Sequence, residues 1–297
     1  MKDSLQMELA VIGGDSRQLA VAEALADLGA NVNVFGHPQE QLSDKIHYCE
    51  ELSVALFKVK AVVLPISGIN DAGLIRSSGV SMIDFGQYFE SLSDETLLIT
   101  GSLASGWKQI AHERKYRVYE YAEDNTVAIL NSIPTAEGAV QLAMEMLPIT
   151  IHNANVLIIG FGRIGITVAR TFKALGGRVT VAARRSELLA RAEEMGCETV
   201  DHQNLAAVFG DANIIINTVP AIVVARSLLT LMSPDALIID LASSPGGIDF
   251  EAAKELNRNA ILAPGLPGKV APKTAGAILA SAIPDIIGRM IEDGGDR

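Results

Sequence analysis

The stretch NVLIIGFGRIG at residues 155–165 decides the fold. Its apolar half predicts a buried strand, and residues 164–175 have the spacing of an amphipathic helix. A strand, a G-x-G-x-x-G turn and a helix are typical of a Rossmann domain, whose backbone N–H groups and helix dipole attract a dinucleotide pyrophosphate. Gly160 permits the tight turn, Gly162 leaves the backbone open to the phosphates, and Gly165 allows close packing of helix on strand. The predicted cofactor-binding residues of this loop are Gly160, Phe161, Gly162, Arg163, Ile164 and Gly165.

The end of the next predicted strand indicates which coenzyme binds. An NAD site usually places a carboxylate there, where it holds the ribose 2′-hydroxyl. In this chain the strand at residues 179–182 continues into Ala183-Arg184-Arg185-Ser186, without a carboxylate. Guanidinium groups and a hydroxyl suit a 2′-phosphate instead, so we predict NADP at Ala183, Arg184, Arg185 and Ser186. The alternative is that both arginines are ordinary solvated residues and that NAD binds.

Three later strand ends are expected to line the same site, because ligands of such sheets bind beyond the carboxyl ends of the strands. We predict these strands at residues 214–217, 237–240 and 261–262. Asp240 is expected to be a structural cap of its loop. The cofactor contacts predicted after the strands are Thr218, Val219, Pro220, Leu241, Ala242, Ser243, Pro264 and Gly265.

The first third of the chain has the same alternation of strands and helices. A helix is predicted over residues 18–28, among strands at residues 9–12, 31–35, 61–64, 97–100 and 117–120. Continuous apolar strands separated by helices indicate a parallel sheet covered on both faces. The predicted fold class is therefore α/β, with two doubly wound parallel-sheet domains joined by helical crossings. The first is flavodoxin- or Rossmann-like, and the second is an NAD(P)-binding Rossmann domain.

A helix that starts at Pro134 is expected to link the domains, because proline is favoured in the first turn. A last helix, interrupted or shifted at Pro284, is expected to cross back. The predicted segments are a substrate-binding α/β domain over residues 1–133, a linking helix over 134–152, a Rossmann domain over 153–272, and a C-terminal helix over 273–297 that packs on the first domain.

Loops after the first-domain strands carry groups that suit a small anionic substrate. The turn after the first strand offers backbone N–H groups, a hydroxyl and a cation, although a turn capped by Asp15 or Ser16 is an equal alternative. Hydroxyl and backbone donors follow two other strands, a threonine lies near the linking helix, and a lysine follows the last strand. The predicted substrate-binding residues are Gly14, Ser16, Arg17, Ser67, Gly101, Ser102, Thr135 and Lys269.

The composition excludes several classes of function. The chain has 24 basic and 35 acidic residues and a net charge of −11, which argues against binding to nucleic acid or anionic membranes. No uninterrupted apolar run reaches the roughly 20 residues of a membrane helix, and no signal peptide is recognisable, so we expect a soluble cytoplasmic protein. Cys49 and Cys197 are expected to be idle buried thiols. The histidines lack metal-ligand spacing and are expected on the surface or in loops, so no metal site is predicted.

Four stretches together resemble one known family. They are IGGDSRQ near the start, NSIPTAEGA before the Rossmann unit, GFGRIG with its following arginine pair, and DLASSPGGIDF with APGLPGKVAPKTAG near the end. They are similar to the A subunit of dipicolinate synthase, a sporulation protein of spore-forming Firmicutes, and the likeness extends over essentially the whole chain. The C-terminal half alone is also similar to alanine dehydrogenases, S-adenosylhomocysteine hydrolases and 2-hydroxyacid dehydrogenases.

The resemblance implies a reaction and a partner. Members oxidise a reduced dipicolinate precursor from lysine biosynthesis to pyridine-2,6-dicarboxylate with NAD(P), and act with a flavoprotein-like B subunit of dipicolinate synthase. It also implies the cytoplasm of the mother cell. It assigns no catalytic residue. Domains of this type often dimerise, but the sequence leaves the oligomeric state open.

Two other readings of the sequence stay open. One is a nucleotide-binding partner that orders or regulates a flavoprotein, because no acid–base pair is evident. The other is an amino-acid dehydrogenase of the alanine dehydrogenase type, which would need a lysine–histidine set that the first domain does not show.

Overall fold

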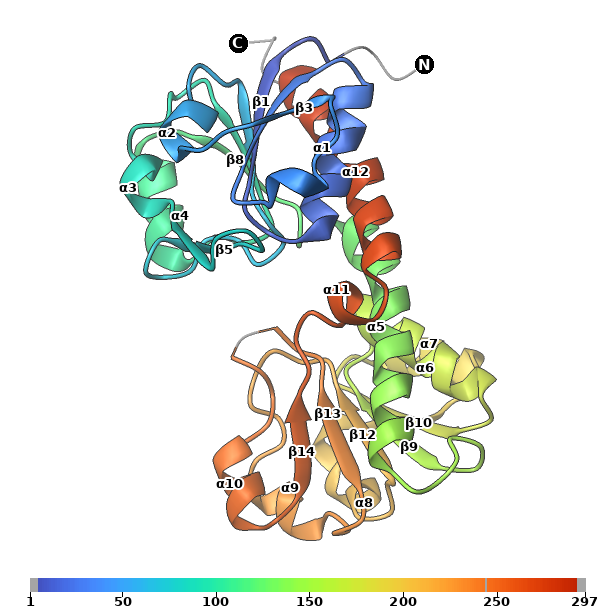
Figure 1. Cartoon of the computed structure of the whole chain (residues 1–297). Coiled ribbons are helices and arrows are strands. Elements are labelled where there is room, and N and C mark those ends of the chain that lie inside the picture. Colours follow the sequence, from blue (N-terminus) through green and yellow to red (C-terminus); the bar gives the residue numbers. More distant parts are fainter. Residues whose placement is uncertain (1–4, 244, 293–297) are drawn as a thin grey trace. The chain divides into compact units, whose positions relative to one another are not determined.

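The computed structural model describes residues 5–243 and 245–292 and divides them into two compact units (Figure 1). The N-terminal unit contains residues 5–128 together with 272–292, and the C-terminal unit contains residues 129–271. The first boundary falls inside helix α5 (Asn125–Met146), and the second falls between α11 (Leu266–Val270) and α12 (Pro272–Glu292). The fold class expected from the sequence is confirmed.

The N-terminal unit is built around a parallel sheet with the strand order β3-β2-β1-β4-β7-β8. Its strands are β1 (Glu8–Ile12), β2 (Asn31–Phe35), β3 (Ile46–Tyr48), β4 (Ala61–Val63), β7 (Leu97–Thr100) and β8 (Arg117–Glu120). A separate antiparallel hairpin is formed by β5 (Leu74–Arg76) and β6 (Met82–Asp84). The helices, besides α12, are α1 (Ser16–Asp27), the 3-10 turn η1 (Gln39–Gln41), α2 (Leu52–Ala55), α3 (Gly86–Phe89) and α4 (Ser105–Glu113).

Successive residues of β1 enter two different cores, as the two-residue period of a strand requires. Leu9 and Val11 belong to one buried cluster, which also contains side chains of α1 and α12. Ala10 and Ile12 belong to a second cluster on the other face, with Phe85 and Phe89. The sheet is therefore buried on both faces, as its continuous apolar strands predicted.

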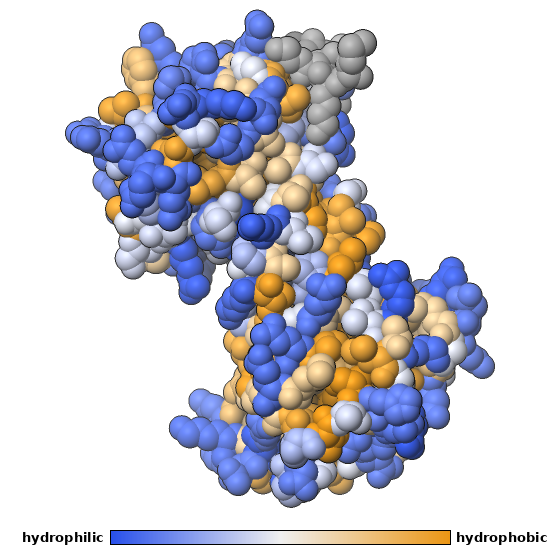
Figure 2. Space-filling view, turned by 45° about the vertical axis from the view of Figure 1, so that its right-hand side comes forward, coloured by the Kyte–Doolittle hydropathy of each residue, from blue (hydrophilic) through white to orange (hydrophobic). Residues whose placement is uncertain are grey.

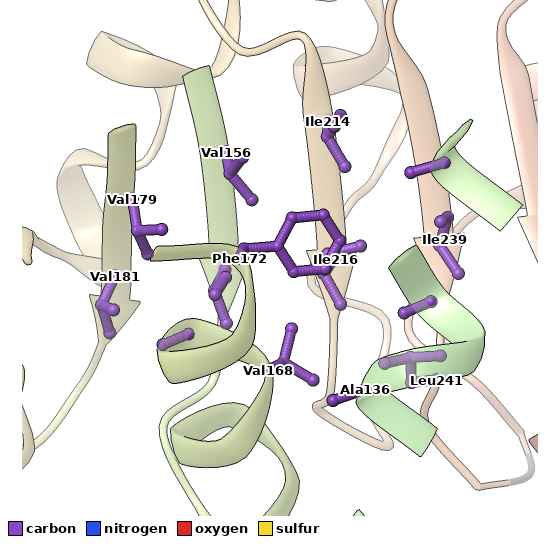
Figure 3. Close-up of a cluster of buried hydrophobic side chains, with 14 of the residues drawn as sticks. Ala136, Val156, Val168, Phe172, Val179, Val181, Ile214, Ile216, Ile239 and Leu241 are labelled. Carbon is purple, nitrogen blue, oxygen red and sulfur yellow. The ribbon is translucent and has the colours of Figure 1, made fainter. Parts of the chain in front are cut away.

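The C-terminal unit repeats this design, with the strand order β11-β10-β9-β12-β13-β14. Its strands are β9 (Asn155–Ile159), β10 (Arg178–Ala183), β11 (Glu198–Asp201), β12 (Ile214–Asn217), β13 (Leu237–Asp240) and β14 (Asn259–Leu262). Its helices, besides α11 and most of α5, are α6 (Arg163–Ala174), α7 (Ser186–Glu194), the 3-10 turn η2 (His202–Asn204), α8 (Ala206–Phe209), α9 (Arg226–Leu231) and α10 (Phe250–Glu255). Phe172 of α6 lies over the sheet beside Val156, Ile214 and Ile216 (Figure 3).

Helix α5 differs from the helix predicted at this place. It begins at Asn125, so Pro134 lies inside the helix and not in its first turn. The reason is a local cap, because Asp124 Oδ1 accepts the backbone N–H groups of Thr126 at 2.8 Å and Val127 at 3.1 Å.

Helix α12 meets the length and composition of a membrane span, and it is the one such helix among the described residues. It is continuous, with Pro284 inside it, so the interruption considered from the sequence is wrong. Leu279, Ile283 and Ile287 of this helix enter the buried cluster that also contains side chains of α1. Hydrophilic residues cover most of the visible face of each unit, and apolar residues gather in limited areas (Figure 2).

Candidate functional site

The turn between β9 and α6 has the geometry that a dinucleotide loop needs. Gly160 has a φ of +93°, and a Cβ there would lie 2.4 Å from Thr218 Oγ1. A Cβ on Gly165 would lie 2.2 Å from the carbonyl oxygen of Gly160, so only glycine lets helix and strand approach so closely. A Cβ on Gly162 would meet nothing within 4 Å. The backbone is therefore open at the glycine that a pyrophosphate would approach.

The start of α6 is suited to a phosphate. Gly162 is the N-cap residue and offers no side chain to the N–H groups of the first turn. These groups carry the positive end of the helix dipole, so an external anion can take the place of a capping side chain. Of the other loop residues, Phe161 is buried, while Arg163 and Ile164 are half-buried. The residues present thus fit the phosphates of a dinucleotide.

The end of β10 exposes two cations. Ala183 is buried, whereas Arg184, Arg185 and Ser186 are exposed at the start of α7. Arg185 forms a surface ion pair with Glu187 at 3.3 Å. Such an exposed pair is weak, so it leaves the guanidinium available to a stronger anion.

The ends of β12 and β13 are held together by a buried carboxylate. Asp240 accepts hydrogen bonds from Asn217 Nδ2 at 2.7 Å, from the Ala242 N–H at 3.1 Å and from the Gly247 N–H at 2.8 Å. Asp240 is therefore the structural cap that the sequence predicted. Among the predicted contacts, Leu241 and Ala242 are buried, Thr218 and Val219 are half-buried, and the exposed ones are Pro220, Ser243, Pro264 and Gly265.

In the N-terminal unit, the turn between β1 and α1 is filled by its own side chains. Asp15 is the N-cap of α1 and accepts the Arg17 N–H at 3.0 Å. Its carboxylate also accepts two hydrogen bonds from the Arg17 guanidinium, at 2.8 and 2.7 Å. Burial opposes ionisation of Asp15, but the hydrogen bonds and charge of Arg17 outweigh it and lower the pKa of the carboxyl. The capped turn, one of the two alternatives, is what forms, and Arg17 is already paired.

The loops after β4 and β7 lie against each other. A Cβ on Gly68 would lie 1.8 Å from the carbonyl oxygen of Ser102, and one on Gly101 would lie 2.1 Å from that of Ile66. The hydroxyl of Ser102 donates to the carbonyl of Ser67 at 3.2 Å. The strands β1, β4 and β7 are neighbours, so the structure brings Gly14, Ser16, Arg17, Ser67, Gly101 and Ser102 to one edge of the sheet.

A buried network that the sequence did not reveal fixes the end of β4. The carbonyl of Leu64 accepts hydrogen bonds from Tyr121 Oη and Gln18 Nε2, both at 2.9 Å. Burial raises the pKa of the Tyr121 phenol, which therefore stays protonated as a donor. The network ties α1 and the end of β8 to the loop that carries Ser67.

Two predicted substrate residues lie elsewhere. Thr135 is in the interior of α5 and donates to the carbonyl of Asn131 at 2.8 Å, so it is not at the helix N-terminus expected for it. Lys269 is exposed in α11. Both belong to the C-terminal unit.

One histidine lies in a loop, which is one of the two positions expected, but it is buried there. His37 is 3% exposed, and its Nε2 lies 2.7 Å from the carbonyl oxygen of Gly13, where it donates. Burial lowers its pKa, which favours the neutral ring.

Cys49 and Cys197 are buried and unpaired, as expected. No group of metal ligands occurs within residues 5–243 and 245–292.

Known proteins match both units. Residues 8–122 match the family model of the N-terminal domain of the dipicolinate synthase A subunit, and residues 131–255 match the D-isomer specific 2-hydroxyacid dehydrogenase NAD binding domain. The dipicolinate synthase A subunit from Bacillus subtilis is 36% identical over 284 residues, covering 95% of this chain and 96% of the relative. The crystal structure of the A subunit from Bacillus halodurans has a TM-score of 0.90 and 38% identity, covering 96% of this chain and 98% of that one.

A more distant structure shows the fold alone. The transhydrogenase from Sinorhizobium meliloti has a TM-score of 0.68 at 16% identity, covering 95% of this chain and 94% of that one. The open glycine loop and the NAD-binding domain match define an oxidoreductase of the dehydrogenase type that binds a nicotinamide cofactor. Within that class, the chain belongs to the family of dipicolinate synthase A subunits.

Proposed function

We propose that this chain oxidises a dihydrodipicolinate-type dicarboxylate to pyridine-2,6-dicarboxylate. The observation that carries the proposal is the similarity to the dipicolinate synthase A subunit over 95% of the chain. The substrate loses a hydride from a ring carbon and a proton to solvent, and the product ring is aromatic. When bound, the nicotinamide ring supplies the hydride acceptor.

Aromatisation determines what the protein has to do. It favours loss of the hydride, so the reaction depends more on alignment of the substrate than on a strong general base. Holding reactants in the reactive geometry can lower a barrier by about 7–11 kcal/mol. The chain's part is therefore to bind and orient a dianion.

We infer that the edge of the N-terminal sheet supplies substrate-binding groups. Ser67 and Ser102 are exposed there. The hydroxyl of Ser67 can donate a hydrogen bond to a carboxylate, and that of Ser102 can do so by giving up its bond to the Ser67 carbonyl. Arg17 lies at the same edge, and Asp15 orients its guanidinium while neutralising part of its charge. The exposed hydroxyl of Ser16 completes this proposed set. Gly14 and Gly101 remain predictions, because their backbone N–H groups already donate to the carbonyls of Arg76 and Pro65. Thr135 and Lys269 of the C-terminal unit remain predictions.

We further propose NADP as the preferred coenzyme. Arg184, Arg185 and Ser186 are exposed where a 2′-phosphate would lie, and no carboxylate occurs in β10 or directly after it, up to Ser186. NAD is the alternative.

The names of the relatives describe each of them as one component of a synthase, the A subunit or A chain. We propose that this chain likewise works with a second, flavoprotein-like component, in the cytoplasm of a sporulating mother cell.

The experiment is an assay of the purified chain with freshly generated dihydrodipicolinate and either NADP or NAD. We expect growth of the reduced-nicotinamide absorbance with NADP and formation of dipicolinate in equal amount. Dipicolinate that forms only after a flavoprotein is added, without nicotinamide reduction, would overturn the proposal. The alanine dehydrogenase alternative predicts reduction with an amino acid as the donor.

A further inference from the structure

Asn131 of α5 has a side-chain amide whose hydrogen bonds are not all made within the described residues. Its Oδ1 atom is buried and has no hydrogen-bond partner in the described part of the chain. The backbone carbonyl of the same residue, by contrast, accepts a hydrogen bond from Thr135 Oγ1. Buried amide oxygens are nearly always paired with protein, water or a ligand. A half-turn of the amide about its last torsion exchanges oxygen and nitrogen at constant shape, so the buried position can hold either atom.

The segment around Asn131 packs beside the dinucleotide helix. The hydroxyl of Ser132, the next residue, lies 2.6 Å from Thr167 Oγ1. Thr167 belongs to α6 and follows Arg163 by one helical turn. This part of α5 therefore lies next to the first turns of the helix that begins at the glycine loop, and both belong to the C-terminal unit.

The direction of α5 places Asn131 beyond the carboxyl edge of the sheet. The helix ends at Met146 and the chain continues into the first residue of β9, so the earlier turns of α5 lie toward the other end of the strands. Ala136 joins the same buried cluster as Leu241, the first residue after β13 (Figure 3). Asn131 precedes Ala136 by five residues, or about 7 Å along a helix.

The face of α5 that carries Asn131 also meets α11. Positions 131, 135 and 138 share one face of a helix. A Cβ on Gly138 would lie 3.1 Å from Leu266 and 3.2 Å from Val270. Asn131 therefore lies on the side of the unit where β13 and β14 end.

The order of the strands separates the two halves of a dinucleotide. The arginines that suit the adenosine phosphate follow β10, on one side of β9, whereas β12, β13 and β14 lie on the other side. The diphosphate binds between them, at the start of α6. The nicotinamide half therefore extends toward β12–β14, which is the side of Asn131.

We propose that the side chain of Asn131 pairs with the carboxamide of the bound nicotinamide and fixes the orientation of that ring. A carboxamide has one acceptor and two donor hydrogens, which complement the donor and acceptor of an asparagine amide. This inference rests on the proposed function, because it requires that a nicotinamide coenzyme binds.

Calorimetric titration of the N131A variant tests the proposal. The ligands are the coenzyme that the wild type prefers and its fragment without nicotinamide, which is 2′-phospho-ADP-ribose or ADP-ribose. Loss of a pair of amide hydrogen bonds should weaken the coenzyme about 10-fold and the fragment less than about 2-fold. S43A is the matched control, since Ser43 Oγ is a buried unpartnered atom in the N-terminal unit, and it should change neither affinity.

A third ligand identifies the group that Asn131 contacts. The nicotinic acid form of the coenzyme has a carboxylate in place of the carboxamide. The wild type should bind it about 10-fold more weakly than the coenzyme, and N131A should lose this discrimination. Discrimination that persists in N131A would show that another group recognises the carboxamide and would refute the pairing with Asn131.

The other possible results of these titrations also test the proposed role of Asn131. Equal binding of all three ligands by N131A and wild type, or equal weakening of coenzyme and fragment, would overturn the proposal. If N131A does not fold, the isosteric N131D variant takes its place, with the same expected loss for the coenzyme alone. A folded wild type that binds neither nicotinamide coenzyme would remove the proposed function, and this inference with it.

Discussion

The two units share a strand order and a strand–glycine–helix turn, but they treat the start of the helix in opposite ways. In the N-terminal unit, Asp15 caps α1 and holds the guanidinium of Arg17. In the C-terminal unit, Gly162 leaves the first turn of α6 without a side-chain cap, and the space above it is open. The same local fold is thus closed by an internal carboxylate in one unit and kept free for an external anion in the other. One residue at the N-cap separates a structural turn from a phosphate site.

The largest effect is expected from Gly162→Asp, which gives α6 the cap of α1. The φ of −93° at Gly162 is open to any residue, and a Cβ there meets no atom, so the fold should persist. The new carboxylate would occupy the N–H groups and repel the phosphates, weakening the coenzyme at least about 100-fold, or ~2.7 kcal/mol. Calorimetry measures this loss. Gly162→Asn is the neutral control, and equal losses in both variants would show that charge is not the cause.

A smaller effect is expected when the cations after β10 are removed. The double variant R184A/R185A should bind NADP at least about 10-fold more weakly, because charge-assisted hydrogen bonds to a phosphate contribute about 1.5–3 kcal/mol. NAD lacks that phosphate, so its affinity should not change. A parallel loss for NAD, or no loss for NADP, would place the 2′-phosphate elsewhere.

The cap of α1 can be broken as well. Asp15→Ala should lower the free energy of unfolding by about 1–2 kcal/mol at pH 7, measured by urea denaturation. Asp15→Asn keeps an oxygen for capping but loses the ion pair, so it should fall between wild type and alanine. The difference in unfolding free energy between wild type and Asp15→Asn should also depend on pH.

The sign of that dependence follows from the lowered pKa of Asp15 in the folded chain. The unfolded carboxyl, with a pKa of about 3.9, binds its proton first as the pH falls. The advantage of wild type over Asp15→Asn should therefore be complete above that value and vanish as the pH falls through the folded pKa. A difference that stays constant down to strongly acid pH would refute the assignment.

The smallest effect is expected from Glu187→Gln. The Arg185–Glu187 pair is about two-thirds exposed on both sides, so its loss should change stability by less than ~0.5 kcal/mol. Release of Arg185 should raise NADP affinity by no more than about 2-fold. Glu194→Gln removes the similar Arg191–Glu194 pair on the same helix and serves as the control. A large gain in affinity would mean that Glu187 competes strongly with the coenzyme.

The sequence predicted the central strands well, because their residues are buried on both faces and form continuous apolar runs. It missed β3, β11 and the β5–β6 hairpin. Strand β11, for example, has polar residues at Glu198 and Asp201 and lies at the edge of its sheet, so no apolar run marks it. The start of α5 was misplaced because Pro134 is a more conspicuous sequence signal than the cap at Asp124.

The features of the candidate sites likewise differ in how far the sequence could reveal them. The glycine loop could be read from sequence because each glycine is required by a steric contact or an approach that the motif encodes. The buried position of His37 and the pairing of Arg17 with Asp15 depend on segments folding together, and neither has a spacing that would reveal it. Asn131 lies in the NSIPTAEGA stretch, but only its missing partner in three dimensions marks it as unusual.

Helix α12 has a consequence for the order in which the protein is made. It supplies Leu279, Ile283, Ile286 and Ile287 to the core of the N-terminal unit, although the ribosome synthesises it after the entire C-terminal unit. Domains generally fold as units during synthesis. The N-terminal unit, which emerges first, therefore cannot complete its core until α12 is made, and until then one apolar side of α1 is uncovered. The C-terminal unit, which emerges second, can fold before α12 is made.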